Sequence, residues 1–300
     1  MTNPQLVRIA TIASVSVAIT LLVIKFYAWL QTDSVSILAS TLDSAFDIIA
    51  SLMIMMAVYI AQIPADKEHR FGHGKAEPLA ALAQSVFIAG SAVYLMVYSL
   101  ERIWTQAEVE KVNIGLAVMI LSLVLTTGLV IFQKYVVRKT ESTAIAADAL
   151  HYLSDVLATL LIIVSLFFVS LNWIDPLLAI LIAVWILHSA YQIAKDSLNQ
   201  LLDRELSDEM RAEISEIILS TPQVLGFNDL RSYQSGPNRF VQLDLELDDK
   251  LTLLAAHDIA EQVTSRLKTR FENLDVIVHQ EPASLRHDHS HHTWGKEYNE

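Results

Sequence analysis

Six long apolar stretches limit what this chain can fold into. Each is long enough for a helix of about 20 residues, which is the length needed to cross a bilayer. They cover residues 6–30, 35–63, 79–103, 112–135, 144–171 and 175–194. The connections between them are short, and 53% of the 300 residues are hydrophobic, more than a domain surrounded by water would carry. The pattern predicts an all-α transmembrane domain of six spans over residues 1–200.

Basic residues are distributed unevenly between the two ends of these spans. One end holds Arg8, Lys67, Arg70, Lys75, Lys134, Arg138, Lys139 and Lys195, whereas the other holds Arg102 and Lys111. The positive-inside rule places the first end in the cytoplasm. Both chain termini are then expected in the cytoplasm. The N-terminal apolar stretch is too long for a cleaved signal peptide.

Two of the apolar stretches contain metal-competent side chains four residues apart. Asp43 and Asp47 form one pair, and His151 and Asp155 form the other. Residues four apart share one face of a helix, and an ionised carboxylate at bilayer depth is costly unless it is paired or bound. Three carboxylates and one imidazole suit Zn²⁺, Cd²⁺, Fe²⁺ or Mn²⁺ and disfavour Cu⁺. We predict one shared transport site, with polar helix packing or a metal-free proton relay as the alternatives.

The two pairs lie in segments that resemble each other. Residues 39–51 align with residues 147–159, with acidic, small and hydroxyl-bearing side chains in matching places. The two spans cross in opposite directions, as in an inverted repeat with its site near the membrane midplane. Metal ligands must be deprotonated to bind, so the same side chains can carry protons back when the metal leaves. Asp148, on the same face as His151 and Asp155, either lines an access path or faces water.

The loop after the second span is a candidate for a second site. Asp66, His69 and His73 could converge on an ion if the loop folds back, and otherwise the loop is simply a solvated polar segment. Lys75 ends this loop and Asp203 follows the last span, so both are expected at the cytoplasmic membrane boundary. Ordinary snorkelling is the alternative to a specific role for these two residues.

The composition changes after residue 200, where a polar linker at residues 201–206 precedes a second domain at residues 207–285. The pattern predicts a helix, two strands, a helix and a strand, over residues 207–220, 224–233, 239–247, 253–271 and 275–279. This αββαβ order predicts a small α+β domain of ferredoxin-like type, whose one-sided sheet offers a dimer surface. The His-rich tail at residues 286–300 is expected to be disordered.

Four side chains of the second domain are candidate metal ligands: Asp244, His257, His279 and Glu281. Alternation along its strand places Asp244, with Glu246, on the exposed face of the sheet. Ligands from separate elements could meet where the second helix abuts the sheet. The alternative is an ordinary polar surface.

Charge and composition exclude several functions. The chain has no cysteine, which excludes disulfides and thiolate metal sites, and its net charge of −12 is unfavourable for binding nucleic acid. It contains no His-Glu-x-x-His segment, so we expect no enzyme. A metal-gated channel and a membrane metal sensor remain as alternatives to a transporter.

Together these features resemble the cation diffusion facilitator family, and within it the bacterial zinc and iron efflux proteins. The resemblance covers residues 5–285 and rests on the six spans, the two ligand pairs, the αββαβ domain and the segment His-Arg-Phe-Gly-His-Gly-Lys-Ala-Glu-Pro-Leu at residues 69–79. It implies a homodimeric Zn²⁺/H⁺ antiporter of the bacterial inner membrane that works by alternating access. Zn²⁺ would be both transported and structural, with Fe²⁺ and Cd²⁺ as further substrates.

The resemblance also implies roles for particular residues. It assigns transport to Asp43, Asp47, His151 and Asp155, a loop site to Asp66, His69 and His73, and a charge interlock between the domains to Lys75 and Asp203. The family has a binuclear zinc site in its cytoplasmic domain, which His257 and His279 match. Asn228 and Asp244 stand in place of histidines, and Glu281 in place of an aspartate. Because an amide is a poor zinc ligand, we expect one ion or weaker binding there.

Overall fold

The computed structural model describes residues 3–32, 35–105, 113–167 and 174–285. The chain divides into two compact units, the first formed by Met1–Leu202 with Ser235–Pro237 and the second by Asp203–Gln234 with Asn238–Glu300. Each unit has its own hydrophobic core. The predicted disorder of the His-rich tail falls outside the described residues.

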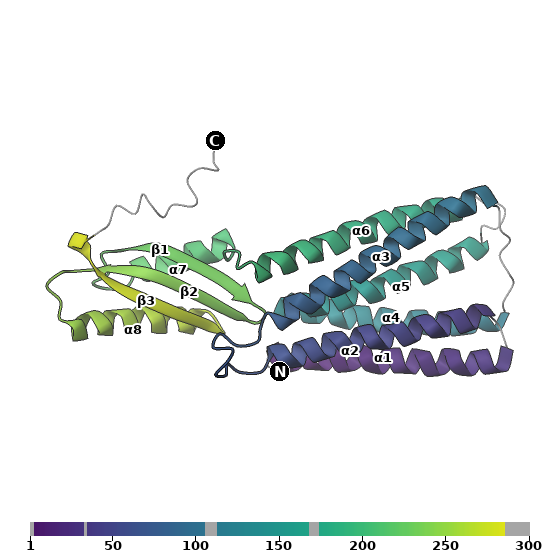
Figure 1. The fold of residues 1–300 in the computed structure, drawn as a ribbon, viewed down its shortest axis with the longest axis horizontal. Helices are drawn as coiled ribbons and strands as arrows, with labels where there is room; N and C mark the ends of the chain where they lie inside the picture. Colours follow the sequence, from purple (N-terminus) through teal and green to yellow (C-terminus); the bar gives the residue numbers. More distant parts are fainter. Residues whose placement is uncertain (1–2, 33–34, 106–112, 168–173, 286–300) are drawn as a thin grey trace. The chain divides into compact units, whose positions relative to one another are not determined.

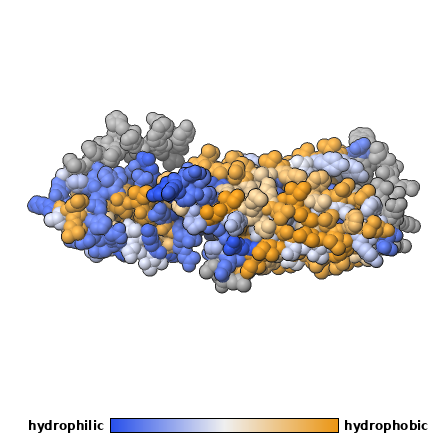
Figure 2. All heavy atoms as spheres, turned by 60° about the horizontal axis from the view of Figure 1, so that its bottom comes forward, coloured by the Kyte–Doolittle hydropathy of each residue, from blue (hydrophilic) through white to orange (hydrophobic). Residues whose placement is uncertain are grey.

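The described residues of the first unit form six long helices, which confirms the predicted number of spans (Figure 1). They are α1 (Asn3–Thr32), α2 (Val35–Ala61), α3 (Ala76–Thr105), α4 (Asn113–Thr140), α5 (Thr143–Phe167) and α6 (Ile174–Leu201). All six are long and apolar enough to cross a membrane. Figure 2 shows hydrophobic residues over most of the visible face of this unit, as expected where the surrounding solvent is lipid.

The fifth helix is the central element of this unit. It contacts each of the other five helices, whereas α1 packs chiefly along α2, and α3 along α6. The first turns of α5 bury the small side chains of Ala144, Ala147 and Ala149. Small residues let neighbouring helices approach closely in a membrane. The helix that carries His151 and Asp155 is therefore the helix with the most neighbours.

Two helices end later than the apolar pattern predicts. The fourth continues to Thr140 and the sixth to Leu201, beyond the ends of the apolar stretches at residues 135 and 194. Glu141 then adopts a left-handed conformation (φ 55°) that stops α4. Directly after it, the hydroxyl of Ser142 accepts the backbone N–H of Ile145 and caps α5. This tight turn fixes where α5 begins.

The second unit has the predicted order of elements. It consists of α7 (Asp208–Leu219), β1 (Gly226–Ser235), β2 (Asn238–Leu247), α8 (Leu253–Arg270), β3 (Leu274–Pro282) and a 3-10 turn (Ala283–Leu285). The sheet order is β1-β2-β3, with β2 parallel to β3. Both helices start at side-chain caps, since Ser207 accepts from the Met210 amide and Thr252 from the Ala255 amide. The αββαβ prediction is confirmed.

One face of this sheet forms the core of the second unit. Leu243 and Leu245 of β2 are fully buried together with Ile214 of α7 and Val263 of α8. Side chains alternate between the two faces of a strand, so the polar residues of β2 lie on the face away from the two helices. That polar face carries the second unit's candidate ligands Asp244 and Glu281.

Candidate metal sites

The second and fifth helices bring three of the four predicted transport ligands together. The ligand atoms of Asp47, His151 and Asp155 all lie within 4.8 Å of one another. His151 Nε2 lies 3.1 Å from Asp47 Oδ1, and the two side chains are 8% and 16% exposed, respectively. One divalent ion placed between them could contact all three ligands. Phe87 of α3 borders the imidazole, with its ring centroid 6.0 Å from that of His151.

The fourth predicted ligand, Asp43, does not belong to this triad. It lies one turn before Asp47 on α2, and its side chain is exposed. Its carboxylate is outside the group of mutually close ligand atoms. The structure thus offers two carboxylates and one imidazole, and a three-ligand set leaves a position open on a tetrahedral ion. Asp43 could fill that position only if its side chain or α2 moved.

A lysine on the first helix lies beside this region. Lys25 Nζ donates to the hydroxyl of Ser44 at 2.8 Å and to the carbonyl of Ser40 at 3.3 Å. Ser44 is fully buried and stands directly after Asp43 in the chain. Lys25 interacts electrostatically with both Asp43 and Asp155. From the sequence alone Lys25 is expected only to snorkel, although a lone cation within an apolar stretch is itself a signal of function.

A second polar cluster lies behind the triad and contains Asp148. This carboxylate is 0% exposed, which contradicts the alternative that it faces water. Its Oδ2 accepts hydrogen bonds from Ser14 of α1 at 2.5 Å and from Gln133 of α4 at 2.7 Å. Next to it, the hydroxyls of Tyr152 and Ser51 are 2.7 Å apart. The pattern of polar residues spaced one turn apart on α5 indicated Asp148, but its partners come from helices distant in sequence.

The loop between α2 and α3 also brings its three candidate ligands together. The ligand atoms of Asp66, His69 and His73 lie within 4.8 Å of one another. His73 Nε2 is 3.1 Å from His69 Nδ1 and 3.4 Å from Asp66 Oδ2. The side chains of Asp66 and His69 are about half exposed, whereas that of His73 is 15% exposed. The arrangement suits an ion bound at the surface of the protein.

Backbone geometry holds this loop in its turned conformation. The carboxylate of Asp66 accepts the backbone N–H groups of His69 at 2.6 Å and of Glu68 at 2.9 Å. The hydrogen bond from the His69 amide, reinforced by that of Glu68, lowers the pKa of Asp66 below its usual range. Gly72 then adopts φ +78°, a conformation that other residues rarely take. The loop therefore turns back before α3 begins at Ala76.

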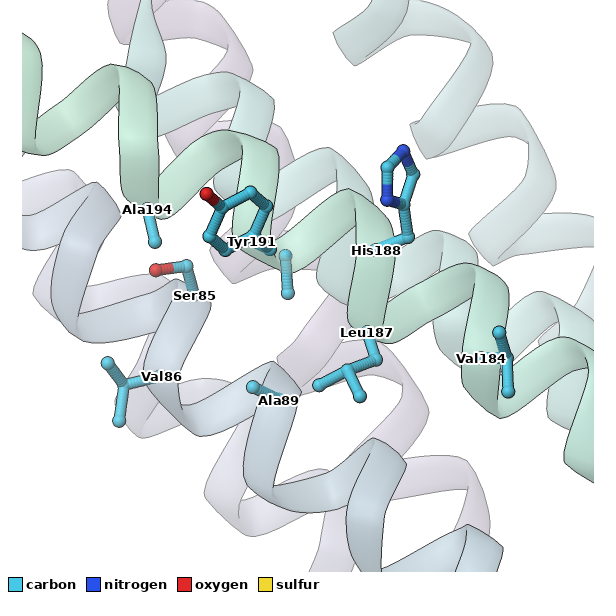
Figure 3. A pocket seen from close by; sticks show the side chains of 9 residues that line it. Ser85, Val86, Ala89, Val184, Leu187, His188, Tyr191 and Ala194 are labelled. Carbon is cyan, nitrogen blue, oxygen red and sulfur yellow. The ribbon is translucent and has the colours of Figure 1, made fainter.

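A groove of about 550 Å³ lies between α3 and α6, away from both groups of ligands. Figure 3 shows Ser85 and Ala89 of α3 facing Leu187 and Tyr191 of α6 across it. The lining is largely apolar. His188, also on its rim, interacts with Gln192 on the same helix, with 3.0 Å between their side-chain nitrogens. The groove offers no set of converging metal ligands among the residues that line it.

The cytoplasmic candidates are only partly close together. Asp244 and His279 are paired across β2 and β3, with His279 Nδ1 3.3 Å from Asp244 Oδ1. Glu281 lies on the same face of β3, two residues further on. His257, however, is exposed on α8, which packs against the opposite face of the sheet. Among the described residues these four do not form a group with mutually close ligand atoms.

The sheet buries a pair of glutamates that sequence reasoning placed differently. Glu246 is 6% exposed, so its predicted exposure on the open face is wrong. It pairs in register with Glu281, which is 8% exposed. The amide of Asn228 donates to both carboxylates, at 3.3 Å to Glu246 and 3.2 Å to Glu281. Asn228 acts here as a hydrogen-bond donor, which fits the expectation that it is a poor metal ligand.

The two residues of the predicted interlock lie in different units. Lys75 belongs to the first unit, where its Nζ lies 3.5 Å from the Leu201 carbonyl. Asp203 opens the second unit with φ 56°, a left-handed conformation that follows the end of α6. The interlock between them stays a prediction.

Comparison with known families covers almost the whole chain. Residues 11–202 match the family described as the cation efflux transmembrane domain, and residues 206–283 match the cation efflux protein cytoplasmic domain. The boundary between these matches falls at the junction of the two compact units.

Curated relatives match over nearly their full length. The chain is 47% identical to the cation-efflux pump FieF of Cronobacter sakazakii over 94% of both chains, and 47% identical to FieF of Citrobacter koseri over 95% of both chains. Among solved structures, one of the putative zinc transporter CzrB in its zinc form is similar with a TM-score of 0.27 and 23% identity, and the match covers 28% of this chain and 97% of the chain in that structure.

Proposed function

Because the chain belongs to the cation efflux family, the cation diffusion facilitators, we propose that it exports Zn²⁺ from the cytoplasm in exchange for protons. It is a multi-pass bacterial membrane protein and a cation efflux transporter. The observation that carries the proposal is the convergence of Asp47, His151 and Asp155 inside the helical unit. Two carboxylates and an imidazole form a donor set for a divalent cation. Charged side chains within membrane-spanning helices are energetically costly, so their presence there indicates a function such as ion binding.

Proton exchange follows from the chemistry of these ligands. Carboxylates and an imidazole must be free of protons to bind the metal. When the ion leaves, protons can take its place on the vacated carboxylates and imidazole. One set of side chains can thus hold either a metal ion or protons, but not both. Alternating access of this site to the two sides of the membrane would couple the two flows.

The donor set narrows the substrate to borderline divalent ions. Imidazole together with carboxylates suits Zn²⁺ and also accepts Fe²⁺ and Cd²⁺, which we propose as further substrates. Soft monovalent Cu⁺ is disfavoured because the chain has no cysteine. The solvent-accessible Asp66, His69 and His73 would hold a second ion in the loop.

We further propose a homodimer in the inner membrane with both termini in the cytoplasm. The match of residues 206–283 to the cytoplasmic domain of cation efflux proteins supports a role for the second unit in assembly. The excess of basic residues at one end of the spans supports the orientation.

The test is metal uptake into inverted membrane vesicles. Asp155→Asn removes a charged triad ligand with little change of shape, and we expect it to abolish Zn²⁺ uptake driven by an imposed pH gradient. Asp258→Asn, on the exposed side of α8, is the matched control and should transport as the parent protein does. Wild-type uptake by Asp155→Asn would contradict the assignment of the site.

The same vesicles separate an exchanger from a passive path. Collapse of the pH gradient with a protonophore should stop concentrative Zn²⁺ uptake. Uptake that continues unchanged would support a metal-gated channel, and Zn²⁺ binding with no uptake at all would support a sensor.

A further inference from the structure

The cluster behind the triad contains a carboxylate, Asp148, whose hydrogen bonds among the described residues come only from neutral side chains. Asp148 of α5 and Gln133 of α4 are both 0% exposed. Both hydrogen bonds to Asp148 Oδ2 come from neutral donors, Ser14 Oγ at 2.5 Å and Gln133 Nε2 at 2.7 Å. Gln133 Nε2 also lies 2.8 Å from Ser14 Oγ. The three side chains thus form a closed polar group among apolar helices.

Two oxygen atoms of this group lack a hydrogen-bond partner among the described residues. They are Asp148 Oδ1 and Gln133 Oε1, and both are buried. The amide oxygen can only accept a hydrogen bond, and so can an ionised carboxylate oxygen. Buried polar atoms are almost always paired in folded proteins. A single added hydrogen on Asp148 Oδ1 would provide the missing donor.

We propose that Asp148 is a proton-binding site of the transport cycle, separate from the metal ligands: it holds a proton in the metal-free protein and releases it when a metal ion binds the neighbouring triad. A protonated carboxyl group and a primary amide are complementary, because each donates one hydrogen bond to the other's oxygen. Gln133 already donates through Nε2, and a protonated Asp148 would donate in return to Oε1. The inference rests on the proposed function, because it assigns a second proton site to that exchange.

The surrounding charges favour this change of state. The titratable groups that act on Asp148 are His151 and Tyr152 on its own helix and Asp47 on α2. In the metal-free site burial and the negative charge of Asp47 oppose ionisation of Asp148, whereas the imidazole of His151, when protonated, favours it. A bound divalent cation adds positive charge next to the cluster and favours ionised Asp148. The proton then leaves for the solvent as H⁺, and Oδ2 keeps its bonds to Ser14 and Gln133.

The direct test is infrared difference spectroscopy of the full-length protein in detergent. Beside any bands from protonated triad carboxylates, the metal-free protein should show one further carbonyl stretch of a protonated carboxyl group, and this band should be absent from Asp148→Asn. Asp258→Asn, on the exposed side of α8, should keep it. Addition of Zn²⁺ should remove the band from the parent protein. A parent spectrum identical to that of Asp148→Asn, or a band that persists with Zn²⁺ bound, would overturn the proposal.

A second variant still tests the proposal if Asp148→Asn folds poorly. Gln133→Met keeps the carboxyl group but removes its acceptor, so the same band should shift to higher wavenumber. An unshifted band would show that Gln133 does not receive this hydrogen bond and would overturn the proposed pairing.

Calorimetry then counts the protons. Titrating Zn²⁺ into the protein in two buffers of different ionisation enthalpy gives the number of protons released per ion bound. Asp148→Asn should release about one fewer than the parent protein while still binding Zn²⁺. An equal count would overturn this inference and leave the proposed function intact, whereas failure of the parent protein to bind Zn²⁺ would overturn the proposed function itself.

Discussion

Of the four side chains expected to bind the transported ion, Asp43 has a different position from the rest. Asp47, His151 and Asp155 have ligand atoms within 4.8 Å of one another, and Asp43 lies outside that group. A carboxylate that must move before it binds contributes less to affinity than one already in place, because part of its interaction energy is used in the movement. The two aspartates of α2 are therefore not equivalent in this conformation.

This difference predicts unequal effects of two matched substitutions. Asp47→Asn should weaken Zn²⁺ binding by about 100-fold or more, beyond the roughly 10- to 100-fold typical of residues that only support ligands. Asp43→Asn should fall within or below that range. Calorimetric titration of each full-length variant, with the loop site silenced by His73→Ala, measures both. Equal losses would show that Asp43 is a full ligand in the resting conformation.

Lys25 leads to a second prediction at this scale. Its ammonium group, anchored by Ser44, adds positive charge next to carboxylates that receive a cation. Lys25→Met should therefore bind Zn²⁺ about tenfold more tightly, since charge repulsion at an effective dielectric constant of about 20 is substantial over several ångströms. The tighter binding should slow release and reduce uptake into vesicles.

Lys25→Arg keeps the charge and serves as the control, with affinity close to that of the parent protein. Structural damage would weaken binding, so a gain in affinity specifically identifies an electrostatic effect. Weaker binding by Lys25→Met would contradict the prediction.

At the scale of single elements, the loop between α2 and α3 should respond to pH in a defined way. The pKa of Asp66 is lowered by the backbone amides of His69 and Glu68. Because this pKa is lowered, the ionised Asp66 carboxylate stabilises the loop fully at any pH above the usual pKa of an aspartate. The stabilisation is lost only as the pH falls through the lowered pKa. Mild acid should therefore leave Asp66 ionised and able to bind metal, since a ligand must be deprotonated to bind.

We expect Asp66 to stay ionised throughout the pH range in which Zn²⁺ binding at the loop weakens. Asp66→Asn should lower the affinity at every pH without shifting the midpoint of the pH dependence. Titrations of full-length protein carrying Asp155→Asn, which silences the membrane triad, would measure this. A midpoint that moves with Asp66→Asn would contradict the expectation.

The elements themselves were predictable, because their signals are local. Long apolar stretches indicate spans, and the alternation of Leu243 and Leu245 with polar residues indicates a strand with one buried face. The same alternation misplaced Glu246, because its burial depends on Asn228 and Glu281 from the neighbouring strands. Spacing of four residues identified the ligand pairs on α2 and α5. It could not show the position of Asp43 or the pairing of Asp148 with Ser14 and Gln133, because side-chain direction and contacts between distant helices decide both.

At the scale of the whole molecule, the division into two compact units predicts separable stabilities. Leu245→Ala removes a 0% exposed side chain from the core of the second unit, and should destabilise that unit by about 2–5 kcal/mol. The triad lies entirely within the other unit, so Zn²⁺ binding there should be unchanged in folded protein. Hydrogen exchange measured by mass spectrometry would report each unit separately. Loss of protection throughout the helical unit would show that the two units unfold together.

The contact of α5 with all five other helices has a consequence for how such a chain can change over evolutionary time. An inserted or deleted residue turns everything beyond it by about 100° around the helix axis. Such a change between Asp148 and His151 would leave the proton-binding cluster in place but point the ion-binding residues toward the wrong neighbours. Length variation should therefore accumulate in the loops and the tail, while the spacing along this one helix stays invariant.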